Sequence, residues 1–138
     1  MKKVFFILGC LILPFLVSCQ REYIQQDALY TVDFDLRPGD WTAVDNYYSV
    51  ALDVKAITRQ VLNDGTVQCF LVYDDGSQAC LPLTRYLSFI DDDGNTGYYQ
   101  KLIDFEFSVG TVNLFYTTSD FYYDEYPEKM RVRVVVHY

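Results

Sequence analysis

Histidine and basic side chains are scarce in this chain of 138 residues. The single histidine, His137, is next to the last residue, so multi-histidine metal sites and Ser-His-Asp catalysis are hard to build. Lysine and arginine number 11 against 19 acidic residues, which excludes a free-standing nucleic-acid binder with a basic footprint. With 51% hydrophobic and 22% charged residues, the chain fits neither a disordered tail nor a multi-span membrane protein.

The sequence also lacks an apolar run long enough to span a bilayer comfortably. Its longest run, residues 4–17, is interrupted by Gly9 and Pro14, whereas a membrane-spanning helix needs roughly 20 residues. Lys2 and Lys3 precede the run, which therefore fits the hydrophobic region of a secretory signal peptide.

The end of this run carries the clearest motif. Leu16-Val17-Ser18-Cys19 resembles a bacterial lipobox, which implies cleavage after Ser18 and lipidation of Cys19. Several acyl chains hold a protein far better than one. An ordinary signal peptide that ends near a cysteine is the alternative. The predicted organisation is a lipoprotein signal peptide at 1–18, a lipidated tether at 19–27 and one β-sandwich domain at 28–138.

The residues after Cys19 bear on location. Gln20 stands where an Asp is associated with inner-membrane retention in enterobacterial lipoproteins. Gln20-Arg21-Glu22 also resembles the start of a surface-export signal, although Tyr23 and Ile24 replace its further acids. We expect an outer-membrane, lipid-anchored protein at the cell surface, with the periplasmic face as the alternative.

Most of the remaining chain alternates between apolar and polar residues with the period of two that is typical of strands. One short helical stretch is expected at residues 57–63, ended by Gly65. This pattern predicts an all-β fold, an antiparallel β-sandwich or flattened barrel of about seven to eight strands. The expected strands are 30–36, 48–54, 66–73, 78–83, 86–90, 98–109, 111–117 and 130–138.

The last strand is expected to be interior, because Val134, Val135 and Val136 are apolar on both faces. Arg131 and Arg133 share one of those faces. We predict that this strand lies beside one or both of the strands that offer paired acids. These acids are Asp33 with Asp35 in the first strand and Asp104 with Glu106 in the sixth.

Two cysteines remain once Cys10 leaves with the signal peptide and Cys19 is lipidated. Cys69 and Cys80 flank a turn, and an exported protein can keep a disulfide between such a pair. Direct opposition would need a two-residue Asp74-Asp75 loop, whereas Asp75-Gly76 is the better turn. The sequence is therefore compatible both with a disulfide between Cys69 and Cys80 and with two separate thiols.

Several scattered residues together resemble an uncharacterised family of small β-rich lipoproteins from Gram-negative anaerobes. The resemblance implies a lipid-anchored sandwich and no activity, since none is established for the family. Val132 stands where that family often has an aromatic residue. The residues that carry the resemblance are Val32-Asp33-Phe34, Asp40-Trp41, Ile57-Thr58, Val61, Gly65, Val67, Leu81-Pro82, Phe107, Gly110, Val112, Ser119-Asp120, Pro127 and Arg133-Val134-Val135-Val136.

Two segments are candidate sites. Asp91, Asp93 and Asn95 offer oxygen ligands for calcium, but an EF-hand spacing would put Phe89 first and Gln100 twelfth, so a solvated turn without metal is favoured. No other cofactor is expected. Tyrosine is abundant, with 13 in the chain. The proposed binding loop contains Phe121, Tyr122, Tyr123 and Tyr126, with core packing as the alternative role.

The sequence therefore favours a non-enzymatic envelope protein that binds a glycan or a protein through tyrosine-rich loops. The alternative is a structural or assembly component of an outer-membrane or fimbria-like complex, engaged at a sheet edge. A small hydrolase ranks far below both, because its paired carboxylates would need a set separation across a cleft. The membrane, through the lipid, is the expected partner in either case, and nucleic acid is not.

Overall fold

The computed structural model describes residues 29–119 and 126–138. In these residues no helix is long and apolar enough to cross a membrane. Several predicted features lie outside the described residues: the signal peptide at 1–18, the tether with Cys19, and Phe121, Tyr122 and Tyr123 of the proposed binding loop.

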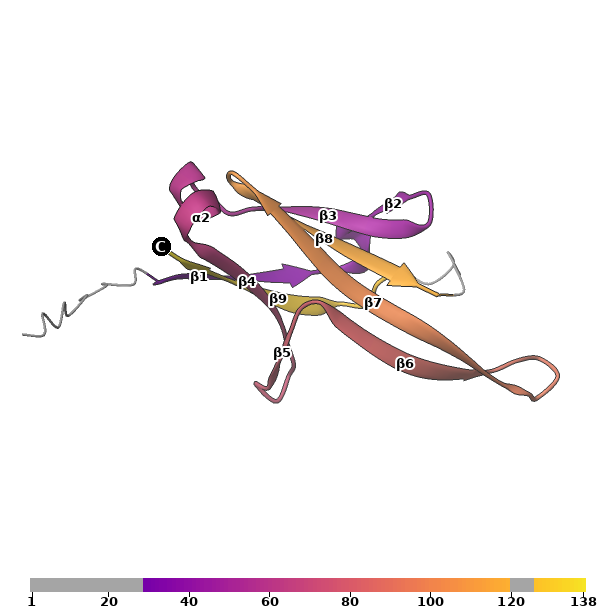
Figure 1. The fold of residues 1–138 in the computed structure, drawn as a ribbon. Helices are drawn as coiled ribbons and strands as arrows, with labels where there is room; N and C mark the ends of the chain where they lie inside the picture. Colours follow the sequence, from indigo (N-terminus) through magenta and orange to yellow (C-terminus); the bar gives the residue numbers. More distant parts are fainter. Residues whose placement is uncertain (1–28, 120–125) are drawn as a thin grey trace, which may run out of the picture.

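The described chain folds into two antiparallel sheets, which confirms the predicted β-sandwich (Figure 1). The sheets stay separate and form no closed barrel within 29–119 and 126–138. Sheet A has the strand order β1-β9-β4-β5, and sheet B has the order β2-β3-β8-β7-β6. The strands are β1 (Leu29–Leu36), β2 (Thr42–Val44), β3 (Tyr47–Asp53), β4 (Thr66–Val72), β5 (Gln78–Cys80), β6 (Leu83–Ile90), β7 (Thr96–Ser108), β8 (Thr111–Thr118) and β9 (Met130–His137).

Eight of these strands match the predicted ones in position. The ninth, β2, is a three-residue strand at the edge of sheet B that the sequence analysis missed. The expected helical stretch is α2 (Arg59–Asp64), capped by the Thr58 hydroxyl, which accepts a hydrogen bond from the Val61 amide. A 3-10 turn, η2 (Pro38–Asp40), follows β1. The Asp40 carboxylate accepts a bond from the Arg37 amide there.

The last strand, β9, lies between β1 and β4, as its apolar faces predicted. Asp33 pairs with Arg133, and Asp35 pairs with Arg131. The other predicted partner is excluded, because Asp104 and Glu106 belong to β7 in the opposite sheet. The paired charges of β1 and β9 therefore lie opposite each other in sheet A, as predicted.

The core lies between the inner faces of the two sheets. In β9, buried valines alternate with less buried residues, and β8 alternates buried and half-buried residues in the same way. Burying each such valine contributes about 1.5–3 kcal/mol. Side chains with no exposed surface come from both sheets and from the segment around α2: Val54, Ile57, Cys69, Val112, Leu114, Val132, Val134 and Val136.

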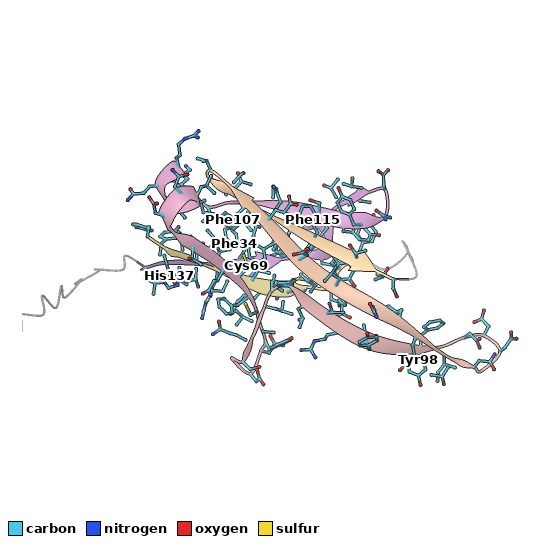
Figure 2. The ribbon with its side chains drawn as sticks, viewed as in Figure 1. Phe34, Cys69, Tyr98, Phe107, Phe115 and His137 are labelled. Carbon is cyan, nitrogen blue, oxygen red and sulfur yellow. The ribbon has the colours of Figure 1, made fainter. Side chains whose placement is uncertain are left out.

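The β6–β7 hairpin extends beyond this core (Figure 1). We call its distal part, residues 86–98, the arm. Tyr86, Ile90 and Tyr98 are 74%, 75% and 76% exposed. On the opposite side, the Phe89 ring lies over Gly97, where any added Cβ would be 2.4 Å from it. The arm is thus a two-stranded ribbon with solvent on both faces, and Figure 2 shows Tyr98 near its end.

Candidate functional site

A cleft of about 800 Å³ opens where the chain leaves sheet A and enters sheet B. Strand β5 ends before Pro82, and a cis Leu81–Pro82 bond precedes β6. We call this cavity the basic cleft. Its described lining comprises Asp35, Leu71, Val72, Tyr73, Asp74, Gly76, Gln78, Leu83, Arg85, Leu87, Lys101, Ile103, Glu128, Lys129, Met130, Arg131 and Arg133.

The lining of the basic cleft reverses the charge balance of the chain. The whole sequence has 11 basic and 19 acidic residues. The described lining has three acids, Asp35, Asp74 and Glu128, and a larger set of cations, Arg85, Lys101, Lys129, Arg131 and Arg133. An excess of positive charge in a concave site raises the local concentration of anionic ligands. The local electrostatics therefore favour an anionic ligand.

Sheet B supplies one wall of the cleft. Leu83 pairs with Ile103, and Arg85 pairs with Lys101. Paired residues of antiparallel strands point to the same side, and so do alternate residues of one strand. Arg85 and Lys101 therefore share the inner face of sheet B with Ile103, which is a core residue. The inner face thus continues past the core and changes there from aliphatic to basic.

Aromatic rings position the two cations of this wall. The Arg85 guanidinium donates a hydrogen bond to the Tyr73 hydroxyl and lies 5.6 Å from the centre of that ring. The Lys101 ammonium lies 5.1 Å from the centre of the Tyr116 ring. Neither cation forms an ion pair with a carboxylate in the described part of the chain. Both positive charges are therefore held in place and left available to a ligand.

Sheet A supplies the second group of cations. Arg133 forms a two-point contact with Asp33, at 2.7 Å from Nε and 2.8 Å from a terminal nitrogen. Arg131 Nε lies 2.8 Å from Asp35 Oδ1. Hydrogen bonding to these arginines lowers the pKa of both aspartates, so the pairs stay ionised over a wide pH range. These cations are partly neutralised, which leaves Arg85, Lys101 and Lys129 as the stronger attractors.

The segment that the sequence offered as a weak metal candidate is a turn in which the Asp91 carboxylate already accepts hydrogen bonds. Asp91 Oδ1 accepts bonds from the Asp93 amide at 3.1 Å and the Asn95 amide at 2.7 Å. Asp91 Oδ2 accepts a bond from the Asn95 side chain. These bonds lower the pKa of Asp91. Gly94 adopts a φ of +85°, which suits the turn. Within the described ranges, no group of three or more His, Cys, Asp or Glu side chains is placed to hold a metal.

The two cysteines are separate thiols, so the disulfide that the sequence left open is not formed. Cys80 pairs with Phe70, one residue away from Cys69. Neighbouring residues of a strand point to opposite faces, which places Cys69 in the core and Cys80 outside. Burial raises the pKa of Cys69 to about 12.

Of the predicted tyrosine-rich loop, only Tyr126 is described. It is 57% exposed, and its ring packs against Tyr48 at 5.2 Å between centres. Tyr48 is a core residue, so the contact of Tyr126 is at least partly structural. The site residues that the sequence analysis missed are Tyr73, Arg85 and Lys101. The sequence indicated the two cations only weakly, because Arg85 and Lys101 are each the single basic residue of their strand.

Comparisons with known proteins define no family for this chain. No protein-family model matches the sequence, and no curated protein matches it. One structural match is the carboxy-terminal domain of the turkey type 3 siadenovirus fibre, avirulent form, complexed with 3-sialyllactose. It has 10% sequence identity and a TM-score of 0.25, over 81% of this chain and 74% of that chain. A likeness at this level carries no argument about what this chain binds.

Proposed function

We propose that this chain is a non-enzymatic, lipid-anchored envelope protein whose basic cleft binds an anionic glycan. One observation carries the proposal: in a chain of net charge −8, five cations and three acids line a single cleft, and Arg85, Lys101 and Lys129 form no ion pair within the described residues. Its volume of about 800 Å³ lies in the range of ligand-binding sites.

The chemistry of the lining suits a sugar that bears carboxylate or sulfate groups. Arg85, Lys101 and Lys129 attract the charged groups, and guanidinium groups bind carboxylates through paired hydrogen bonds. Tyr73 and Leu87 add the aromatic and apolar surface that the faces of sugar rings contact. The lining groups with shifted pKa values, Asp35, Arg131 and Arg133, are all held in their charged forms, which suits binding more than proton transfer.

Calorimetric titration with polygalacturonate, heparin and neutral dextran tests the proposal. We expect the two polyanions to bind and dextran not to bind. The double variant Arg85→Gln/Lys101→Gln should weaken polyanion binding by about tenfold or more, because it removes the two unpaired charges of one wall. Arg59→Gln, which removes an exposed charge on α2, is the matched control. Equal binding of dextran, or unchanged binding by the double variant, would contradict the proposal.

Lipid anchoring at the outer membrane is part of the same proposal. The apolar run, the lipobox-like Leu16–Cys19 segment and Gln20 support it. The resemblance to a lipoprotein family of Gram-negative anaerobes points the same way. A Cys19→Ala variant should lose incorporation of labelled palmitate and should leave the membrane fraction. Digestion of the mature domain on intact cells would support surface display, whereas protection until lysis would support the periplasmic face.

The second candidate function is that of an assembly component. It is favoured by the exposed arm and by two eight-residue strands, β1 and β6, that each have one edge unpaired among the described residues. Such edges can accept a strand from a partner.

A further inference from the structure

We propose that the basic cleft also receives the acidic tip of the arm from a second copy of this chain, so that copies associate head to tail. The acidic tip is Asp91, Asp92 and Asp93. The inference rests on the proposed function in one respect, namely that the cleft binds carboxylates, and it names a protein partner for that site.

The acidic tip is built to present negative charge. Asp91 holds the turn through three accepted hydrogen bonds, with its pKa lowered, so it stays ionised. Asp92 and Asp93 are exposed, and their side chains form no ion pair within the described residues. Three consecutive carboxylates therefore lie at the end of a protruding ribbon (Figure 1).

The basic cleft is the complementary surface. Arg85 and Lys101 carry charges that no carboxylate neutralises in the described part of the chain, and Lys129 adds a third. Complementary charge across an interface speeds association and fixes orientation. The cleft also has aliphatic lining from Leu71 and Leu87. This lining can cover part of the apolar surface of an incoming arm.

The arm cannot reach the cleft of its own molecule. Leu87, at the cleft, and Asp91, at the tip, belong to one hairpin whose strands stay paired from Leu83 to Ile90. Four strand residues place the tip about 13 Å further along the ribbon. An acidic tip that enters the cleft therefore comes from another molecule. Because the cleft and the tip are different surfaces, the contact between copies is heterologous. A row of associated copies therefore has a free cleft at one end and a free tip at the other.

The exposed side chains of the arm support the same partner. Tyr86, Ile90 and Tyr98 are each about three-quarters exposed. An isolated two-stranded ribbon is only marginally stable in water, so contact with a second molecule would stabilise it. Copies held on one membrane would meet at a high effective concentration, and even a weak contact would then be populated.

Sedimentation velocity of the full chain in reducing buffer, at concentrations up to about 1 mM, tests the inference. The reducing buffer prevents cross-linking through the exposed Cys80. The tip variant is Asp92→Lys/Asp93→Lys, which spares the turn-forming Asp91. The cleft variant is Arg85→Glu/Lys101→Glu. Asp53→Lys/Asp64→Lys, two exposed acids elsewhere, controls for net charge.

We expect the wild type and the control to self-associate with rising concentration. Each charge-reversed variant should associate at least about tenfold more weakly. A mixture of the two variants should associate again, because the basic cleft of one fits the acidic tip of the other and the acidic cleft fits the basic tip. The variant that combines all four changes should regain association.

Two outcomes would overturn the inference: a wild type that is monomeric throughout, or variants that associate as the wild type does. Titration with polygalacturonate separates the two proposals. If the polyanion binds the wild-type cleft while no self-association occurs, the glycan proposal stands and the head-to-tail contact fails. If self-association follows the charge reversals but no polyanion binds, the head-to-tail contact stands and the glycan proposal fails.

Discussion

Two cysteines on the paired strands β4 and β5 lie in opposite environments. Cys69 has no exposed surface, while Cys80, opposite Phe70, is exposed. The thiolate is the reactive form of cysteine, and burial raises the pKa of Cys69 to about 12. Two thiols that are close in the hairpin therefore differ in both access and ionisation.

Alkylation should distinguish these two thiols. With iodoacetamide near pH 8, we expect Cys80 to be modified in the folded protein and Cys69 to be protected. In urea both should react, because unfolding removes the burial that protects Cys69. Mass mapping of the modified peptides gives the result. Equal labelling of both residues in the native state, or a disulfide-linked peptide, would contradict the separate-thiol structure.

The aspartates of β1 should make stability depend on acid pH. Their pKa values are lowered in the folded state through hydrogen bonds to Arg133 and Arg131. A carboxylate with a lowered folded pKa stabilises above its unfolded pKa, and this contribution is lost as the pH falls through the folded pKa. The melting temperature should therefore stay level from neutral pH to about pH 5 and should fall below about pH 4.

The double variant Asp33→Asn/Asp35→Asn provides the control for this pH dependence. Its melting temperature should be lower than that of the wild type at pH 7. It should also fall less steeply in acid, because two of the titrating groups are gone. Thermal unfolding followed by circular dichroism from pH 2.5 to 7 measures both effects. Identical pH profiles would show that the β1–β9 pairs contribute nothing to stability.

Strand β9 is a central element of sheet A, because it is paired on both sides and buried at alternate residues. Its valines at 132, 134 and 136 have no exposed surface. Each fills space between the two sheets, where truncation leaves a cavity.

Truncation of Val134 tests this role. Val134→Ala should lower the free energy of unfolding by about 2 kcal/mol, because it removes buried methyl groups and leaves a cavity. Val109→Ala, at a position 52% exposed, should change the free energy by less than about 0.5 kcal/mol. Urea denaturation gives both values. Similar losses for the two variants would contradict the interior position of β9.

Much of the fold is predictable from the chain because sheet burial imposes a period of two. The pattern of Val132, Val134 and Val136 identifies an interior strand, and the acids of β1 identify its neighbour. Strand β2 was missed because three residues are too few for alternation to show. The length of the arm was missed too, since alternation does not reveal whether anything covers a face.

The basic cleft was not predictable for a different reason. Its cations are separated in sequence, from Arg85 through Lys101 to Arg131, and none stands out locally. Only the pairing of β6 with β7, and the position of that pair against sheet A, brings them together. A search for cations on the inner side of neighbouring strands could have found Arg85 and Lys101.

At the scale of the whole molecule, the arm and the start of β1 lie at opposite ends (Figure 1). If the chain is anchored ahead of β1, as we propose, the arm extends away from the membrane, with the basic cleft at its base. The proposed contact surfaces, the basic cleft and the acidic tip, then lie at different distances from the membrane. The net negative charge of the chain limits non-specific contact with anionic partners outside the cleft.

The pairing of the first described strand with the last also dictates the order in which this protein can fold. The Asp33–Arg133 bond joins residues 100 positions apart, and β9 is the only strand that connects β1 to β4. Sheet A therefore cannot be completed before residues 130–137 have left the ribosome. Topologies dominated by such distant pairings fold slowly, in milliseconds to seconds. During synthesis, β1 and β4 therefore wait for β9 as the strand that pairs with both of them.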